Sequence, residues 1–146
     1  MPKDYDPRMH SAEHILNQTM DRMFRCGRSF EAHIEPGKSR CYYQFDRELG
    51  ADEVREIESR VNEVIQSDVE VREEFMPRAE VGKWFNLRRV PDDAGDPLRV
   101  IRIGDYDACP CIGSHVKRTK EIGGFQIYST SYEGGVLKVR FRLSEP

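Results

Sequence analysis

Residues 9–16 read Met-His-Ser-Ala-Glu-His-Ile-Leu, and they lie within a longer pattern that predicts the first helix of the fold. Apolar side chains recur at helical spacing at Met9, Ala12, Leu16, Met20 and Met23. Asp6 and Pro7 precede this pattern and are typical of a helix start, because Asp caps the helix and proline lacks the N–H that would stay unpaired there. Gly27 stands where a C-terminal cap belongs. The predicted helix places His10 and His14 on one side.

The patterns outside this helix predict short strands and two further helices. A second helix is expected from about residue 52 to residue 66, where an apolar stripe lies opposite a charged side, and a short one near residues 78–85. Strands are expected at residues 40–45, 69–71, 98–103, 125–132 and 136–143. The last two runs flank Glu133-Gly134-Gly135 and are typical of a hairpin, whereas residues 91–97 are expected to form a surface loop. The predicted fold class is α+β, with helices packed on a mostly antiparallel sheet.

Length and composition indicate a single domain that covers residues 1–146. No apolar leader and no membrane-spanning run occurs, so we expect a cytoplasmic protein without a membrane partner. Four cysteines are few for a disulfide scaffold and are expected to stay reduced. The net charge of -3 argues against a broad nucleic-acid surface but leaves room for a local basic patch.

Two separate half-sites suggest a metal centre. His10 and His14 are four residues apart, so both imidazoles of the predicted helix can reach one cation. Near the other end, Cys111 and His115 have the same spacing around a glycine. Three nitrogens and one sulfur suit tetrahedral Zn²⁺. The alternative is a pair of ordinary helix histidines, with a buried Cys and a loop His that never meet them.

A second zinc pattern uses the same helix. His10-Ser-Ala-Glu13-His14 matches the inverted zincin motif H-x-x-E-H, in which the glutamate is a general base of a peptidase. A chamber for polypeptides is hard to build from 146 residues, and this interpretation leaves Cys111 and His115 without a role. It is therefore the less favoured of the two.

Several segments in order resemble the second additional domain of alanyl- and threonyl-tRNA synthetases, and especially its free-standing alanyl-tRNA editing relatives. The family's H-x-x-x-H and C-x-G-T-H motifs correspond to His10-Ser-Ala-Glu-His14 and Cys111-Ile-Gly-Ser-His115. Three further segments match in the same order: residues 57–65, 100–105 and 119–123. The resemblance runs from about residue 8 to residue 142 and implies a synthetase editing-domain-like fold.

The resemblance implies a stand-alone, zinc-dependent or zinc-organised aminoacyl-tRNA deacylase that acts in trans. Its partner would be mischarged tRNA, with serine or glycine removed from the tRNA of alanine. The alternative is a non-catalytic zinc-stabilised module that binds tRNA or a synthetase, because four protein ligands make a closed site of the kind that is usually structural. Weak self-association is left open by the sequence.

Other residues near these motifs are candidates for the remaining roles. Glu13 and Asp107 are candidate catalytic bases, or partners that orient the histidines. The candidate residues of the amino-acid pocket are Ser11, Gly113 and Ser114. The candidate tRNA-binding residues are Arg8, Arg102, Lys117, Arg118 and Lys120. Trp84 and Phe85 could stack on a base, but core packing is the favoured interpretation for both.

Overall fold

The computed structural model describes residues 6–85, 87 and 90–146 and has the predicted α+β fold class. The helices are α1 (Pro7–Phe24), α2 (Ala51–Gln66) and α3 (Arg78–Trp84), with short 3-10 turns η1 (Asp92–Ala94) and η2 (Thr119–Ile122). The strands are β1 (Glu31–His33), β2 (Lys38–Gln44), β3 (Val71–Met76), β4 (Leu98–Ile103), β5 (Asp107–Pro110), β6 (Phe125–Glu133) and β7 (Val136–Leu143). None of the described helices combines the length and apolar character that crossing a bilayer requires.

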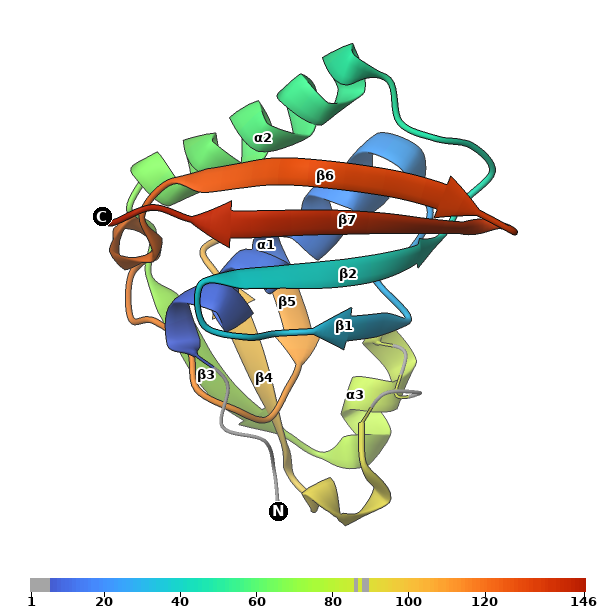
Figure 1. Cartoon of the computed structure of the whole chain (residues 1–146). Helices are drawn as coiled ribbons and strands as arrows, with labels where there is room; N and C mark the ends of the chain where they lie inside the picture. Colours follow the sequence, from blue (N-terminus) through green and yellow to red (C-terminus); the bar gives the residue numbers. More distant parts are fainter. Residues whose placement is uncertain (1–5, 86, 88–89) are drawn as a thin grey trace.

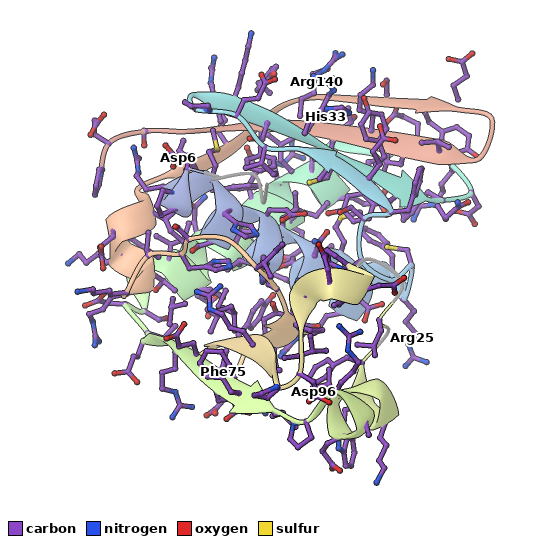
Figure 2. The ribbon with its side chains drawn as sticks, turned by 90° about the horizontal axis from the view of Figure 1, so that it is seen from below. Asp6, Arg25, His33, Phe75, Asp96 and Arg140 are labelled. Atoms are coloured by element: carbon purple, nitrogen blue, oxygen red, sulfur yellow. The ribbon has the colours of Figure 1, made fainter. Side chains whose placement is uncertain are left out.

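The strands form two antiparallel sheets rather than one. The larger has the order β1-β2-β7-β6 and the smaller β3-β4-β5. Helix α1 lies between the two sheets, and α2 runs beside β6 (Figure 1). The view along the layers shows α1 in the middle, with the larger sheet on one side and the smaller on the other (Figure 2).

Helix α1 is buried along most of its length because both sheets cover it. Its apolar residues join α2 and the inner face of the larger sheet in the main core. The same helix also buries polar side chains, among them His10, Ser11, Glu13, His14 and Asn17. Buried polar groups need partners. Asn17 has one in Tyr43 of the larger sheet, whereas His10 and Ser11 bond to residues of the loop that follows β5.

The sequence predicts the N-terminal cap of α1 correctly but not its C-terminal cap. Asp6 caps the helix through its Oδ1, which accepts from the N–H groups of Arg8 and Met9, as predicted. The prediction that Gly27 is the C-cap is wrong. Arg25 adopts the left-handed conformation at φ 55° and donates its N–H to Asp21 O, so the helix ends two residues earlier.

Two other predictions are wrong in detail. The strand expected at residues 69–71 runs instead over Val71–Met76. This edge strand leaves its charged middle exposed, so its residues lack the alternating pattern that predicts a strand. Trp84 is not a core residue: it is 70% exposed, and its Nε1 donates to Glu80 Oε1. Phe85 is partly buried and packs against the small apolar cluster of Val81, Leu98 and Val100, as expected.

Candidate metal centre

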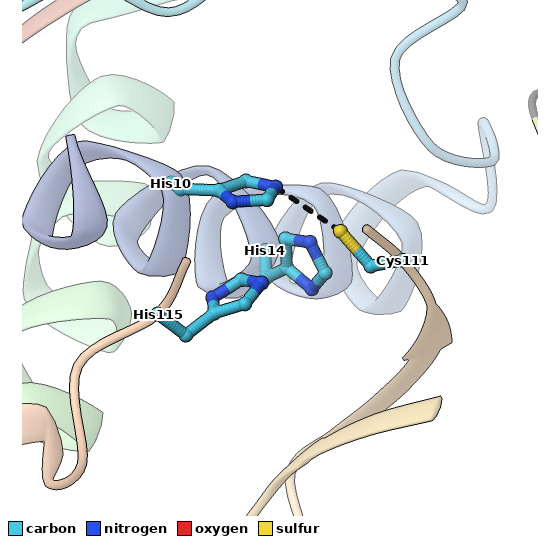
Figure 3. Close-up of side chains that lie close together, drawn as sticks. All are labelled: His10, His14, Cys111 and His115. Carbon is cyan, nitrogen blue, oxygen red and sulfur yellow. Dashed lines mark hydrogen bonds between the residues drawn. The ribbon is translucent and has the colours of Figure 1, made fainter. Parts of the chain in front are cut away.

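Four side chains from opposite ends of the sequence meet between α1 and the loop that follows β5 (Figure 3). His10, His14, Cys111 and His115 each offer one ligand atom, and these atoms all lie within 4.8 Å of one another. His10 and His14 share a side of α1 because they are four residues apart. The two half-sites therefore come together as the spacing suggests.

The Cys111–His115 loop is held in place by strand β4. Cys111 N–H donates to Arg99 O over 3.1 Å, which extends the pairing of β5 with β4. The guanidinium of Arg99 donates to Gly113 O over 2.7 Å and to Cys111 O over 3.4 Å. These contacts fix the loop backbone beside α1, so the thiol and the last imidazole reach the helix histidines.

Two of the imidazoles are oriented by hydrogen bonds on the ring nitrogen that points away from the cluster. His10 Nδ1 lies 3.1 Å from Ser114 O and donates to it, while its Nε2 lies 3.1 Å from Cys111 Sγ. His115 Nδ1 lies 2.9 Å from Ser11 Oγ, which also accepts the N–H of Val116. The Ser114 carbonyl can only accept, so it fixes the tautomer of His10 and leaves Nε2 with a lone pair for a cation. His115 has the same form when the Ser11 hydroxyl accepts from its Nδ1.

The third imidazole faces a buried carboxylate. His14 Nδ1 lies 3.6 Å from Asp107 Oδ2, which is too long for a hydrogen bond but close for a charge contact. Arg28 contacts both carboxylate oxygens, at 2.8 and 3.2 Å, and Gln18 Nε2 donates to Oδ1 over 3.0 Å. Burial favours the neutral acid, but His14 and Arg28 outweigh it and lower the pKa of Asp107 to about 2.

The chemistry of this cluster fits a bound cation. His115 Nε2 is a buried nitrogen without a hydrogen-bond partner among the described residues, and it is the ring nitrogen that is not bonded to Ser11. Burial and the neighbouring Cys109 and Glu13 raise the pKa of the Cys111 thiol to about 12, and burial lowers the pKa of His115. A neutral imidazole with a free lone pair is the form that binds metal, and a cation converts a buried thiol to the thiolate ligand.

The two candidate bases are both buried, but their surroundings differ. Asp107 is held in an ion pair, and its low pKa makes it a weak proton acceptor at neutral pH. Glu13 is one position before His14 on α1, and its Oε2 lies 3.5 Å from Asn17 Nδ2.

The candidate pocket residues are used partly by the site itself. The hydroxyl of Ser11 is buried and bonded to His115 and Val116, so it stabilises the cluster. Ser114 is exposed and holds His10 through its carbonyl. Gly113 has φ 106°, a conformation that favours glycine, and its carbonyl accepts from Arg99.

The five predicted tRNA-binding residues do not gather at the candidate metal centre. Arg8 donates to Ile122 O and Ser144 O and so ties α1 to the C-terminal segment. Arg102 pairs with Glu74 at 2.7 Å, and Arg118 pairs with Asp68 at 3.3 Å. The remaining two, Lys117 and Lys120, are exposed around η2.

Sequence reasoning missed Arg28, Gln18 and the anchoring role of Arg99. Gln18 continues the four-residue spacing of His10 and His14, so its place on this side of α1 could have been expected. Arg28 follows the helix in an irregular segment, and no pattern connects it with Asp107, which is 79 residues away. Its role depends on the tertiary fold.

An open groove adjoins the candidate metal centre. It has a volume of about 600 Å³ and shares Gln18 and Asp107 with the surroundings of the cluster. Arg22, Arg72 and Arg102 line it together with the ring of Tyr106, over which the Arg22 guanidinium lies at 4.2 Å. Glu74 and Asp105 also line the groove.

The fold and site define a class: an α+β domain in which a central helix and a loop bring three histidines and a cysteine together in a cluster that could hold a metal ion. A family profile described as "Threonyl and Alanyl tRNA synthetase second additional domain" matches residues 98–138. The chain is thus a protein of the second-additional-domain type of alanyl- and threonyl-tRNA synthetases, which confirms the resemblance in its motifs.

Similar proteins extend this match over most of the chain. The alanine–tRNA ligase of Fervidobacterium nodosum is 34% identical over 85% of this chain and 14% of its own length. The alanine–tRNA ligase of Ignicoccus hospitalis is 30% identical over 92% of this chain and 15% of its own length. That of Lysinibacillus sphaericus is 32% identical over 87% and 14%. The chain spans only 14–15% of the length of these relatives.

Proposed function

We propose that this chain is an aminoacyl-tRNA deacylase that acts in trans as one domain and removes serine or glycine wrongly attached to the tRNA of alanine. The main support for this proposal is a cluster of four candidate ligands in a domain related to alanine–tRNA ligases. The cluster consists of His10, His14, Cys111 and His115. The reaction would add water across the ester bond and release the free amino acid and the 3′-hydroxyl of the tRNA. This activity would take place in the cytoplasm, where aminoacyl-tRNA is used.

Zn²⁺ is the ion we propose for the cluster, because three imidazoles and one thiolate match its preferred ligands. When bound, it supplies Lewis acidity toward the ester carbonyl and toward water. The protein's own part is to hold the ligands in one tautomer through Ser114 O, Ser11 Oγ and the Asp107 carboxylate.

Asp107 is a positioning residue in this proposal, and Glu13 is the carboxylate that takes the proton from water. The ion pair of Asp107 with Arg28 lowers its basicity and suits it to fixing His14. We assign the groove lined by Gln18, Arg22 and Tyr106 to the nucleotide end of the substrate, because cationic and aromatic side chains suit phosphate and base.

The proposal is tested with the purified chain alone. It should release serine or glycine from mischarged alanine tRNA and leave alanyl-tRNA intact, and His10→Ala and Cys111→Ala should abolish release. A panel of serine, glycine, alanine and threonine esters identifies the amino acid, and metal analysis of the same preparation identifies the ion. Circular dichroism of each variant separates loss of chemistry from loss of fold.

One observation favours a second function. Four protein ligands close a tetrahedral site, and closed sites are generally structural. A metal-stabilised module that binds tRNA without hydrolysing it would show bound zinc, a folded chain and no release from any ester of the panel.

A further inference from the structure

The larger sheet has an outward face that carries an unusual concentration of positive charge. We name this the outer basic face and define it by Lys38, Arg40, Lys138, Arg140 and Arg142. These residues alternate along β2 and β7 with core positions such as Cys41 and Val139, so their side chains point away from α1. Figure 2 shows Arg140 and His33 on this side of the sheet, opposite the layer that contains β3 to β5.

The strand register places like charges directly opposite each other. Arg40 pairs with Arg140, and Lys38 pairs with Arg142. Among the residues that the structure describes, none of the five cations of the outer basic face forms an ion pair with a carboxylate. Like charges opposite one another destabilise a sheet, so fold stability does not account for this arrangement.

Aromatic rings lie among the cations. Lys138 Nζ lies 5.9 Å from the centroid of the Tyr42 ring, and the Arg142 guanidinium lies 5.6 Å from that of Tyr128. Phe30 and Tyr128 are 42% and 38% exposed, and the Phe30 and Tyr42 rings are 6.4 Å apart. Alternating cations and rings on a sheet surface suit RNA, because phosphates meet charge and unpaired bases can stack.

The middle of the face is hollowed. A depression of about 290 Å³ is lined by Glu35, Lys38, Ser39, Arg40, Tyr128 and Arg140. Glu35 is the one carboxylate of this lining, and Glu31 on the adjoining strand β1 contacts His33 at 3.1 Å. Three cations converge on a depression without an aliphatic side chain, which suits a phosphate group better than the apolar interior of a bilayer.

From this register, charge and ring pattern we propose that the outer basic face binds the phosphate backbone of tRNA. A second copy of this face is disfavoured as the occupant because its cations would repel. The choice of tRNA among polyanions rests on the proposed function. Since the face lies on the far side of α1 from the metal centre, it contacts a part of the tRNA other than the esterified 3′ end.

The outer basic face is compatible with the negative net charge of the whole chain. The overall charge of -3 argues against a broad nucleic-acid surface only if charge is spread evenly. The acidic side chains are instead concentrated elsewhere, for example on α2 and β3, where they pair with arginines.

The test is binding of uncharged tRNA to the full chain over a range of salt concentrations, measured by fluorescence anisotropy. The variant Arg40→Gln/Arg140→Gln/Arg142→Gln should bind about tenfold or more weakly at 0.1 M salt. The slope of log affinity against log salt should fall by about two to three, because each lost phosphate contact removes about 0.9. Its melting temperature should be equal or higher, since opposed like charges are removed.

A matched control is Arg55→Gln/Arg60→Gln/Lys83→Gln, which changes the net charge equally at residues paired with Asp52, Glu56 and Glu80. It should bind tRNA with the wild-type slope. If the triple variant does not fold, Arg140→Gln alone gives the same test, with a slope lower by about one.

Unchanged affinity and slope in the outer-face variant would overturn the inference, as would an equal loss in the control. Binding of the wild type to phosphatidylserine vesicles but not to tRNA would assign the face to a membrane instead. Uncharged tRNA carries no ester, so this measurement fails or succeeds independently of the proposed hydrolysis.

Discussion

His14 Nδ1 faces the carboxylate of Asp107 at 3.6 Å, and Arg28 and Gln18 hold this carboxylate in place by hydrogen bonds. This relationship connects helix α1 with strand β5 at the point where the candidate ligands meet. A carboxylate behind a ligating histidine orients the ring and increases its basicity. We therefore expect Asp107 to act on the cluster through His14.

Asp107→Asn should weaken zinc binding by about 10- to 100-fold, because the amide keeps the shape but loses the charge that orients His14. Competition with a chromophoric chelator measures this affinity. Asp105→Asn, at an exposed position two residues earlier, is the control and should bind as the wild type does. Equal affinity of Asp107→Asn and wild type would show that the carboxylate does not support the site.

The same carboxylate predicts how stability depends on pH. Its pKa falls from an ordinary 3.8 to about 2 on folding, so between these values the unfolded chain binds more protons than the folded one. The stabilisation, about 2 kcal/mol for this difference, is present above about pH 4 and is lost as pH falls toward 2. Urea unfolding of the metal-free protein from pH 5 to pH 2 should show it, and Asp107→Asn should have a flatter profile.

Cys111 and Cys109 should differ sharply as metal ligands. Only Cys111 belongs to the cluster of four ligand atoms, although the two thiols are two residues apart. Cys111→Ser should lose most of its bound zinc because a hydroxyl is a poor ligand for this ion, while Cys109→Ser should keep it. Elemental analysis after dialysis measures the occupancy. Retention by Cys111→Ser with loss by Cys109→Ser would reverse the assignment.

Ser11→Ala should destabilise the protein by about 1–3 kcal/mol, because the buried N–H of Val116 and the ring of His115 both lose their partner. Denaturant midpoints measure the change. Ser59 is exposed on α2, so Ser59→Ala serves as the control and should shift stability by about 0.5 kcal/mol or less. A Ser11→Ala variant as stable as this control would mean that water replaces the hydroxyl.

Local patterns predicted most elements of the fold. The β4 bounds Leu98–Ile103 and the β6–β7 hairpin follow from alternation and the two glycines, which have φ 57° and 84° at Gly134 and Gly135. The bounds of β3 do not follow from the sequence, because the exposed middle of this edge strand has no buried side to create a pattern. The exposure of Trp84 does not follow from local sequence, because it depends on whether another element covers α3.

The sequence by itself determined the ligand types, their spacing and the family, since these depend only on residue identity and helical or strand period. Only the tertiary structure decided that residues about 100 positions apart meet, that Arg28 lowers the pKa of Asp107, and that Arg40 lies opposite Arg140. Contacts between distant segments follow from how two sheets pack on α1. Local residue patterns do not encode that packing, because it depends on the burial of all the segments together.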